Sequence, residues 1–385
     1  MISKTPTLGD IFLSFFRLGL TAFGGPAMVA EIRKMAVGEK GWLSEASFRD
    51  GAGLCQMIPG ATAMQAAAYV GLRVRGMGGG ACSFIGFALP AGLLMLLLSF
   101  LYARAHALPA IVSVFNGLQV VVVAIVANAT LTFGRTWLKD WQGVLVASAA
   151  AVMFGFGIHP IVAILTAGLC GLGFYHRQTF PVTAAADGTD SYSLKPLIWI
   201  LLAVALAFML LYLFQRRFFE LAFLMAKVDL FAFGGGFSSL PLMFNEVVHV
   251  RGWVDSLTFL DGIALGQITP GPIVITATFI GYMRYGLPGG IIATVAIFLP
   301  SFLIIAGLVP YYDRLRSSPL FNRALRGILY SFVGLLLSVT IRFGMKVPWE
   351  AIRILLACGT FAALFFKVRL IYPVLAGIAV SLLFL

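Results

Sequence analysis

The strongest constraint on how this chain can fold is a block of twenty residues that occurs twice. GWLSEASFRDGAGLCQMIPG at positions 41–60 returns as GWVDSLTFLDGIALGQITPG at positions 252–271, with nine identical residues and a spacing of 211 positions. Segments that share a pattern of small, apolar and polar residues favour the same local structure. The sequence therefore predicts two repeats, at residues 1–175 and 218–385, joined by a polar linker and one extra helix at residues 176–217.

Long apolar stretches indicate the class of protein. The chain of 385 residues is 60% hydrophobic and 11% charged, whereas soluble domains carry about 25% charged residues. The stretches 83–102, 111–133 and 196–214 contain no charged residue, and a helix of about 20 apolar residues can cross the hydrocarbon core of a bilayer. We expect an all-α, polytopic integral membrane protein with about 12 to 13 transmembrane helices.

The predicted helices follow the same order in both halves. In the first repeat they cover residues 8–28, 44–71, 80–103, 109–133, 142–157 and 159–175, and in the second 218–240, 256–281, 288–310, 322–342, 350–366 and 369–385. The stretch 196–214 has no counterpart, and one extra crossing turns the second repeat over, so we expect inverted repeats. In this topology Lys and Arg are in excess on the side of the N-terminus, which favours a cytoplasmic N-terminus.

Glycine and proline interrupt the first two helices of each repeat. Phe23-Gly24-Gly25 returns as Phe233-Gly234-Gly235, and Gln-x-x-Pro-Gly ends at Gly60 and again at Gly271. Proline removes a backbone donor and glycine permits angles that break a helix. Within a membrane such backbone is tolerated only inside protein or beside a water-filled cavity, and a new helix N-terminus offers N–H groups to an anion. The breaks predict an anion site; kinks or close-packing glycines are the alternative.

The residues that we expect to bind the substrate belong to these motifs and their immediate neighbours. They are Gly24, Gly25, Gln56, Pro59, Gly60, Gly234, Gly235, Gly236, Gln267, Thr269, Pro270, Gly271 and Pro272. The two copies are not equivalent, because Pro272 has Ala61 as its counterpart. We expect the second copy to be the more important one for the substrate.

Each repeat also carries one matched cation and one matched acid inside its predicted helices. Arg17 and Lys227 each lie six residues before a Phe-Gly-Gly motif, and Asp50 and Asp261 each lie six residues before the motif glutamine. Isolated charges in a bilayer are costly and often mark ion pathways or proton relays. We hypothesise that the two cations attract an anion, while the two acids hold those cations or carry coupling protons. A structural ion pair, or cations that reach the membrane interface, is the alternative.

Two other groups of residues stand out along the chain. Charged residues on the connection between the first two helices of each repeat predict a mostly solvated loop, with a gate as the alternative: Glu31, Arg33, Glu246, His249 and Arg251. Gly78-Gly79-Gly80 and Gly289-Gly290 are expected to start the third helices or to let backbones pack closely.

Motifs for catalysis are missing from the sequence. It contains no Walker loop, nucleotide fingerprint or nucleophile elbow, and its four Cys and four His residues lack metal-ligand spacing. The basic residues behind the net charge of +12 are scattered singly, which does not indicate nucleic-acid binding. We expect a protein that is not an enzyme and that uses no metal, cofactor or nucleic acid.

The doubled motifs resemble those of a known family. Phe23-Gly24-Gly25-Pro26, the Gly41-Trp42-Leu43 segment and Gln-x-x-Pro-Gly, present in two copies, are similar to the chromate ion transporter family over both halves of the chain. The resemblance implies a secondary transporter of the bacterial inner membrane that exports chromate, driven by the membrane potential or a proton gradient, and that confers chromate resistance. This sequence departs from the family pattern of Pro-Gly-Pro in each half, because its first copy reads Pro59-Gly60-Ala61.

Several functional alternatives stay open at this level. The expected partners are a chromate- or sulfate-like oxyanion and the lipid bilayer, with a homodimer as one expected assembly. Nothing in the residues distinguishes chromium from sulfur in a tetrahedral oxyanion. Exchange or uptake of sulfate or another oxyanion, and a passive anion channel, are therefore the alternatives to chromate export.

Overall fold

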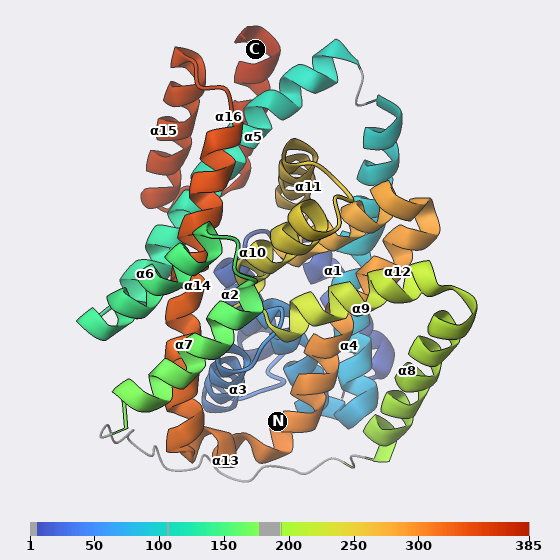
Figure 1. Cartoon of the computed structure of the whole chain (residues 1–385). Helices are drawn as coiled ribbons and strands as arrows, with labels where there is room; N and C mark the ends of the chain where they lie inside the picture. The colour runs from blue at the N-terminus through green and yellow to red at the C-terminus, as the bar shows by residue number, and fades with distance from the viewer. Residues whose placement is uncertain (1–5, 106–107, 177–192, 194, 385) are drawn as a thin grey trace. The chain divides into compact units, whose positions relative to one another are not determined.

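A computed structural model describes residues 6–105, 108–176, 193 and 195–384. This part of the chain is helical and contains no strand, which confirms the all-α prediction (Figure 1). The first repeat holds α1 (Leu8–Thr21), α2 (Gly25–Arg33), η1 (Lys34–Glu39), α3 (Glu45–Met57), α4 (Thr62–Ala105), α5 (Pro109–Trp137), α6 (Trp141–Gly155) and α7 (Pro160–Phe174).

The extra helix predicted between the repeats is α8 (Lys195–Phe214). The second repeat follows with α9 (Arg216–Leu230), η2 (Gly236–Ser238), α10 (Ser239–Phe244), η3 (Asn245–Val250), α11 (Ser256–Ile268), η4 (Ile273–Ile275), α12 (Thr276–Leu308), η5 (Val309–Tyr311), α13 (Tyr312–Ser317), α14 (Pro319–Lys346), α15 (Ala351–Phe365) and α16 (Ile371–Phe384). Most of the polar linker lies outside the described residues.

Membrane-spanning helices are present in both repeats. Five of the described segments are long and apolar enough to cross a bilayer: α4, α5, α8, the segment Ile273–Tyr311 around α12, and α14. Helix α8 is apolar on all sides and only Leu197 is buried, as expected for a helix that faces lipid. The chain is therefore a polytopic α-helical membrane protein.

The described chain forms two compact units, and each unit takes segments from both repeats. The first unit comprises Met1–Leu96, Thr179–Gly236 and Thr269–Pro319, and the second comprises Leu97–Gln178, Phe237–Ile268 and Leu320–Leu385. A repeat in the sequence and a compact unit in space are thus different divisions of this chain. The repeat boundaries at 1–175 and 218–385 stay a prediction.

The Pro-Gly motifs break their helices, as predicted. The stretch 44–71 divides into α3, which ends at Met57, and α4, which begins at Thr62. The stretch 256–281 divides in the same way between Ile268 and Ile273. Each break includes a glycine with a φ of 122°, an angle that excludes a right-handed helix.

The Phe-Gly-Gly motifs also break helices, and here the predicted boundaries were wrong. The stretch 8–28 is not one helix, because α1 ends at Thr21 and α2 begins at Gly25. The stretch 218–240 likewise divides between α9 and α10. Gly24 and Gly234 have φ values of 78° and 85°, so the chain leaves the helix at these glycines and resumes it afterwards.

The glycine clusters lie at the start of the third helices, as predicted. Non-helical backbone angles at Arg75 and Gly76 divide α4 into two arms, and those at Tyr285 and Gly286 divide α12. The second arm of each begins directly after these residues, so Gly78-Gly79-Gly80 and Gly289-Gly290 lie in its first turn. A Cβ atom on Gly79 would overlap the carbonyl oxygen of Gly71. A Cβ atom on Gly289 would overlap that of Gly281 in the same way. The glycines therefore allow the two arms of each kinked helix to pack closely, which was the other predicted role.

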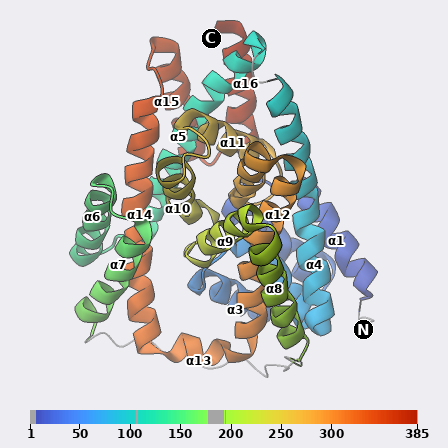
Figure 2. The same cartoon turned by 45° about the vertical axis from the view of Figure 1, so that its right-hand side comes forward.

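Helix α5 organises the packing of the second unit. It packs against α11, α15 and α16, whose labels surround it in Figures 1 and 2. On α14, Gly327 lies against the backbone of Ala167 and Gly334 against that of Ala147, so α14 approaches α7 and α6 closely at these two points. Small residues at such close helix–helix contacts are typical of helix pairs in membranes.

Candidate functional site

The two broken-helix motifs of the first unit pair with each other across the repeats. The N–H group of Gly60 in the first repeat donates to the carbonyl oxygen of Ala232 in the second, at 2.9 Å. The N–H group of Gly271 donates to the carbonyl oxygen of Ala22, at 3.0 Å, and Gly271 forms a parallel bridge with Phe23. Each Pro-Gly turn is therefore held by the Phe-Gly-Gly segment of the other repeat. We call this arrangement the crossing.

Only glycine fits at the centre of each Pro-Gly turn. Gly60 and Gly271 share a φ of 122°, which side chains rarely adopt. A Cβ atom on Gly60 would also overlap the Oγ atom of Ser301, and one on Gly271 would lie 2.8 Å from the Cβ atom of Ala91. Both backbone angle and contact explain why the motif ends in glycine in each repeat.

The two sides of the crossing differ by one hydrogen bond. The N–H group of Ala61 donates to Ser301 Oγ at 2.8 Å. The counterpart of Ala61 is Pro272, which has no N–H group, and the counterpart of Ser301 is Ala91, which has no acceptor in its side chain. Where the second repeat has Pro272, the first has Ala61, and the additional N–H group of Ala61 finds its acceptor in the hydroxyl group of Ser301 on α12.

A buried carboxylate that our sequence reasoning did not select lies beside the crossing. Asp229, in the last turn of α9, is 0% exposed. Its Oδ2 atom accepts hydrogen bonds from the backbone N–H group of Ser301, at 2.8 Å, and from the Ser301 hydroxyl, at 2.7 Å. Comparing the repeats could have singled it out, because its counterpart is Gly19 and the acid is unmatched.

The predicted substrate-binding residues occupy different environments. Gly24, Gly25, Pro59, Gly60, Gly234, Gly235, Gly236, Thr269, Pro270, Gly271 and Pro272 belong to the first unit, in or beside the crossing, whereas Gln267 belongs to the second unit. A Cβ atom on Gly235 would lie 3.1 Å from Thr62 Oγ1, at the start of α4. The Thr269 hydroxyl faces Met95 Sδ at 3.8 Å.

The two motif glutamines are not alike. Gln56 is exposed on the last turn of α3, whereas Gln267 is 7% exposed on the last turn of α11. The Nε2 atom of Gln267 is buried and has no hydrogen-bond partner within the described part of the chain. A buried N–H donor without an acceptor is costly, and an anionic oxygen would satisfy it.

The matched charged residues differ in how far they are buried. Arg17 is exposed on α1, on the face that also carries exposed Leu13 and Leu20, while Lys227 and Asp50 are partly buried. Asp261 is 6% exposed and belongs to the second unit. It accepts hydrogen bonds of 2.7 Å from Tyr102 and Gln119, both neutral. Its described partners therefore include no cation.

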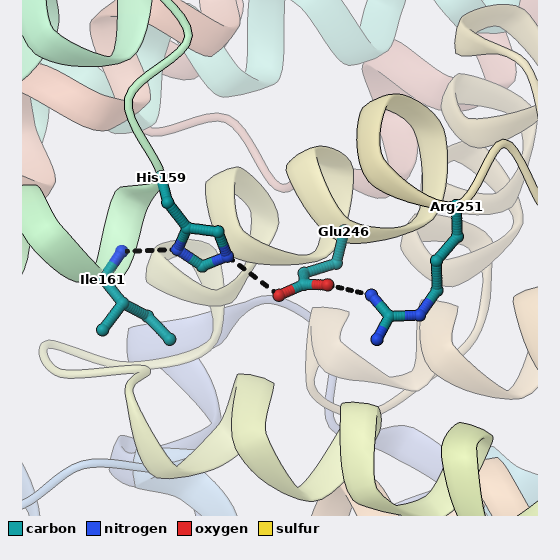
Figure 3. Close-up of polar contacts among 4 residues, drawn as sticks. All are labelled: His159, Ile161, Glu246 and Arg251. Carbon is teal, nitrogen blue, oxygen red and sulfur yellow. Dashed lines mark hydrogen bonds and ion pairs between the residues drawn. The ribbon is translucent and has the colours of Figure 1, made fainter.

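The connection in the second repeat is less solvated than expected. Glu246 lies in the π-helical turn η3 with 2% of its side chain exposed. His159 Nδ1 accepts from the N–H group of Ile161, so the His159 Nε2–H group donates to Glu246 Oε1 at 2.9 Å, and Arg251 pairs with the other carboxylate oxygen (Figure 3). In the first repeat the pair between Arg33 and Glu45 is exposed, as expected, but Arg33 ends the helix α2 and does not lie in a loop.

Comparisons with known proteins place these features in one family. The family model described as chromate transporter matches residues 9–172 and again residues 219–382. An uncharacterized transporter of Methanocaldococcus jannaschii is 41% identical over 99% of this chain and 96% of its own length. Chromate transport proteins of Cupriavidus metallidurans and Pseudomonas aeruginosa are 29% and 30% identical, over 98% and 92% of this chain and 93% and 85% of their own lengths. No solved structure matches the chain.

Proposed function

Since this chain belongs to the chromate transporter family, we propose that it exports chromate from the cytoplasm as a secondary transporter of the cytoplasmic membrane and so confers chromate resistance. The observation that carries the proposal is the crossing, in which Gly60 and Gly271 each pair with the other repeat. Interrupted helices that meet in this way are typical of substrate sites in transporters built from inverted repeats. We further propose that the two repeats are inverted and that the N-terminus is cytoplasmic.

The chemistry of the crossing suits an oxyanion. Chromate is a tetrahedral dianion that needs N–H donors and positive potential. A broken helix that resumes has N–H groups at its start that can bind an anion, and α4 begins at Thr62, directly after the first Pro-Gly turn. Lys227, on α9, supplies a positive charge in the unit that contains the crossing. These groups can hold a dianion without a metal ion.

The membrane potential favours export. Moving one elementary charge across a membrane changes its energy by about 2.3 kcal/mol per 100 mV, so expulsion of a dianion from an inside-negative cell gains about twice that amount. Coupling to protons would add to this driving force. We propose proton-coupled antiport.

Chromate accumulation in cells tests the proposal. Cells that produce the protein should accumulate less chromate than cells without it, and Gln267→Ala should reduce the difference at equal protein levels in the membrane. Inverted membrane vesicles then separate the alternatives. Saturable chromate uptake that sulfate does not inhibit supports chromate export, preferential sulfate flux assigns another oxyanion, and unsaturable flux insensitive to the proton gradient indicates a channel.

A further inference from the structure

We propose that Asp229 is a proton-binding carboxyl group whose protonation state controls the crossing. Proton binding by Asp229 does not depend on which ion is transported, whereas a role of Asp229 in coupling rests on the proposed function. The sequence motifs do not include this residue. Asp229 is buried, has an oxygen without a described partner, lies at the end of α9 and is linked to the first Pro-Gly turn through Ser301.

The carboxyl group of Asp229 lacks the partners that a permanent negative charge requires. The residue is 0% exposed, and its Oδ1 atom has no hydrogen-bond partner among the described residues. Both of its described hydrogen bonds come from Ser301 and reach only Oδ2. A buried carboxylate with a bare oxygen is strongly disfavoured, and addition of a proton removes the charge.

The position of Asp229 on its helix also disfavours the charged form. The residue lies in the last turn of α9, where the free carbonyl groups create a negative potential. Two described tyrosines of α8 and α12 meet α9 at its other end. Tyr212 contacts Phe219 and Tyr285 contacts Phe218, and the guanidinium groups of α9 lie over the same two tyrosines.

No described cation offsets the charge from nearby. The described hydrogen bonds of the Asp229 carboxyl group come from the neutral residue Ser301. A resident cation would be the usual way to keep a buried carboxylate charged. The proton is therefore the ligand that this site fits best.

The first repeat has no room for an equivalent carboxyl group. The counterpart of Asp229 is Gly19, and a Cβ atom on Gly19 would lie 2.6 Å from the carbonyl oxygen of Phe87. No side chain fits there without displacement of the backbone. The proton site is thus confined to the second repeat, on the same side as Ser301.

Ser301 connects the carboxyl group to the crossing. Its hydroxyl group donates to Asp229 Oδ2 and accepts from the N–H group of Ala61, which follows directly on Gly60. When Asp229 takes up a proton from water, an O–H bond forms, the negative charge disappears and the hydrogen bonds from Ser301 weaken, because bonds to a charged acceptor are stronger. When the proton returns to water, the bonds tighten. The proton thereby changes how firmly the first Pro-Gly turn is held.

Infrared difference spectroscopy on the purified full-length protein measures proton binding without transport. A pH jump should reveal a protonated-carboxyl band that is lost in Asp229→Asn and retained in Asp255→Asn. Asp255 is an exposed residue at the start of α11, where Asn also caps a helix. Asp261→Asn and Glu246→Gln identify the bands of the other two described buried acids. A band that persists in Asp229→Asn overturns the proposal.

Ser301→Ala keeps the carboxyl group and removes one donor to it. The pH at which the Asp229 band disappears should rise by about one unit, because one hydrogen bond to the charged form is lost. If Asp229→Asn does not fold, Ser301→Ala tests the proposal in its place. An unchanged midpoint contradicts the proposal, since a purely structural role for Ser301 would not move it.

Proteoliposomes test the role in coupling. Asp229→Asn should lose chromate movement driven by a pH gradient while it retains chromate-for-chromate exchange, and Asp255→Asn should retain both. Gradient-driven transport in Asp229→Asn, or dependence of the wild type on Na⁺ in place of the pH gradient, overturns the coupling role. Wild-type protein that moves no chromate refutes the proposed function instead, and the infrared result then stands by itself.

Discussion

The amide N–H group of Gly60 donates to the carbonyl oxygen of Ala232 at 2.9 Å, although the two residues lie in different repeats. The repeat-related pair, Gly271 and Ala22, makes the same bond at 3.0 Å. A break in a membrane helix leaves backbone groups that must find partners inside the protein. Here each repeat supplies the partners for the other, so the first unit needs segments from both.

Alanine at the turn glycines should destabilise the protein. Gly271→Ala places a side chain at a φ of 122° and near Ala91, which should cost about 1 to 3 kcal/mol. Denaturation of the detergent-solubilised protein measures the change. Gly359→Ala is the matched control, because this helical glycine has open space around its Cβ position, and the control should be neutral or stabilising. Equal stability of the two variants would contradict the assigned role of Gly271.

Two substitutions can introduce the equivalent of the hydrogen bond between Ala61 and Ser301 on the other side of the crossing. Pro272→Ala creates a buried N–H group without an acceptor and should cost about 1 to 3 kcal/mol. Adding Ala91→Ser supplies a hydroxyl group where the other side has Ser301, and should recover about 1 kcal/mol. A double-mutant cycle measures the coupling between the two positions. Strictly additive effects would show that residues 91 and 272 do not face each other as Ser301 and Ala61 do.

Loss of the buried glutamine should affect transport more than loss of the exposed one. Gln267→Ala removes a buried donor and should raise the KM for chromate about tenfold, the effect of one hydrogen bond to a charged group. Gln56→Ala should have a smaller effect, because Gln56 is exposed. Initial rates of chromate uptake into inverted vesicles provide the comparison. A larger effect at Gln56 would move the site toward the first repeat.

Glu246, which is buried in the second unit, should contribute to the stability of the protein. Glu246→Ala leaves Arg251 without its partner and removes the acceptor of His159, which should cost about 2 to 4 kcal/mol. Arg33→Ala breaks a pair whose side chains are 57% and 53% exposed, and should cost less than about 1 kcal/mol. Unfolding of both variants under the same conditions measures the difference. Comparable losses would mean that Glu246 is not held as Figure 3 draws it.

Much of the fold follows from local rules that act within one segment. The apolar stretch 196–214 became α8 almost residue for residue, and the Pro-Gly motifs broke their helices where predicted. The predicted ends at Phe-Gly-Gly failed because a glycine with positive φ can interrupt a helix that then resumes. The start of the third helix was predicted correctly, but the partner of its glycines was not, because the contact of Gly79 with the carbonyl oxygen of Gly71 joins two arms of the chain and is not visible in a single segment.

The sequence by itself determined that this is a helical membrane protein with two related halves and interrupted helices, because hydrophobicity, proline and glycine act locally and recur with the repeat. Only the tertiary structure decided which segments pair. It joined Gly60 to Ala232 across the repeats, buried Asp229 against Ser301, and placed Arg17 on an exposed face. Burial and hydrogen bonding depend on what packs against a residue, and residues distant along the chain supply those neighbours.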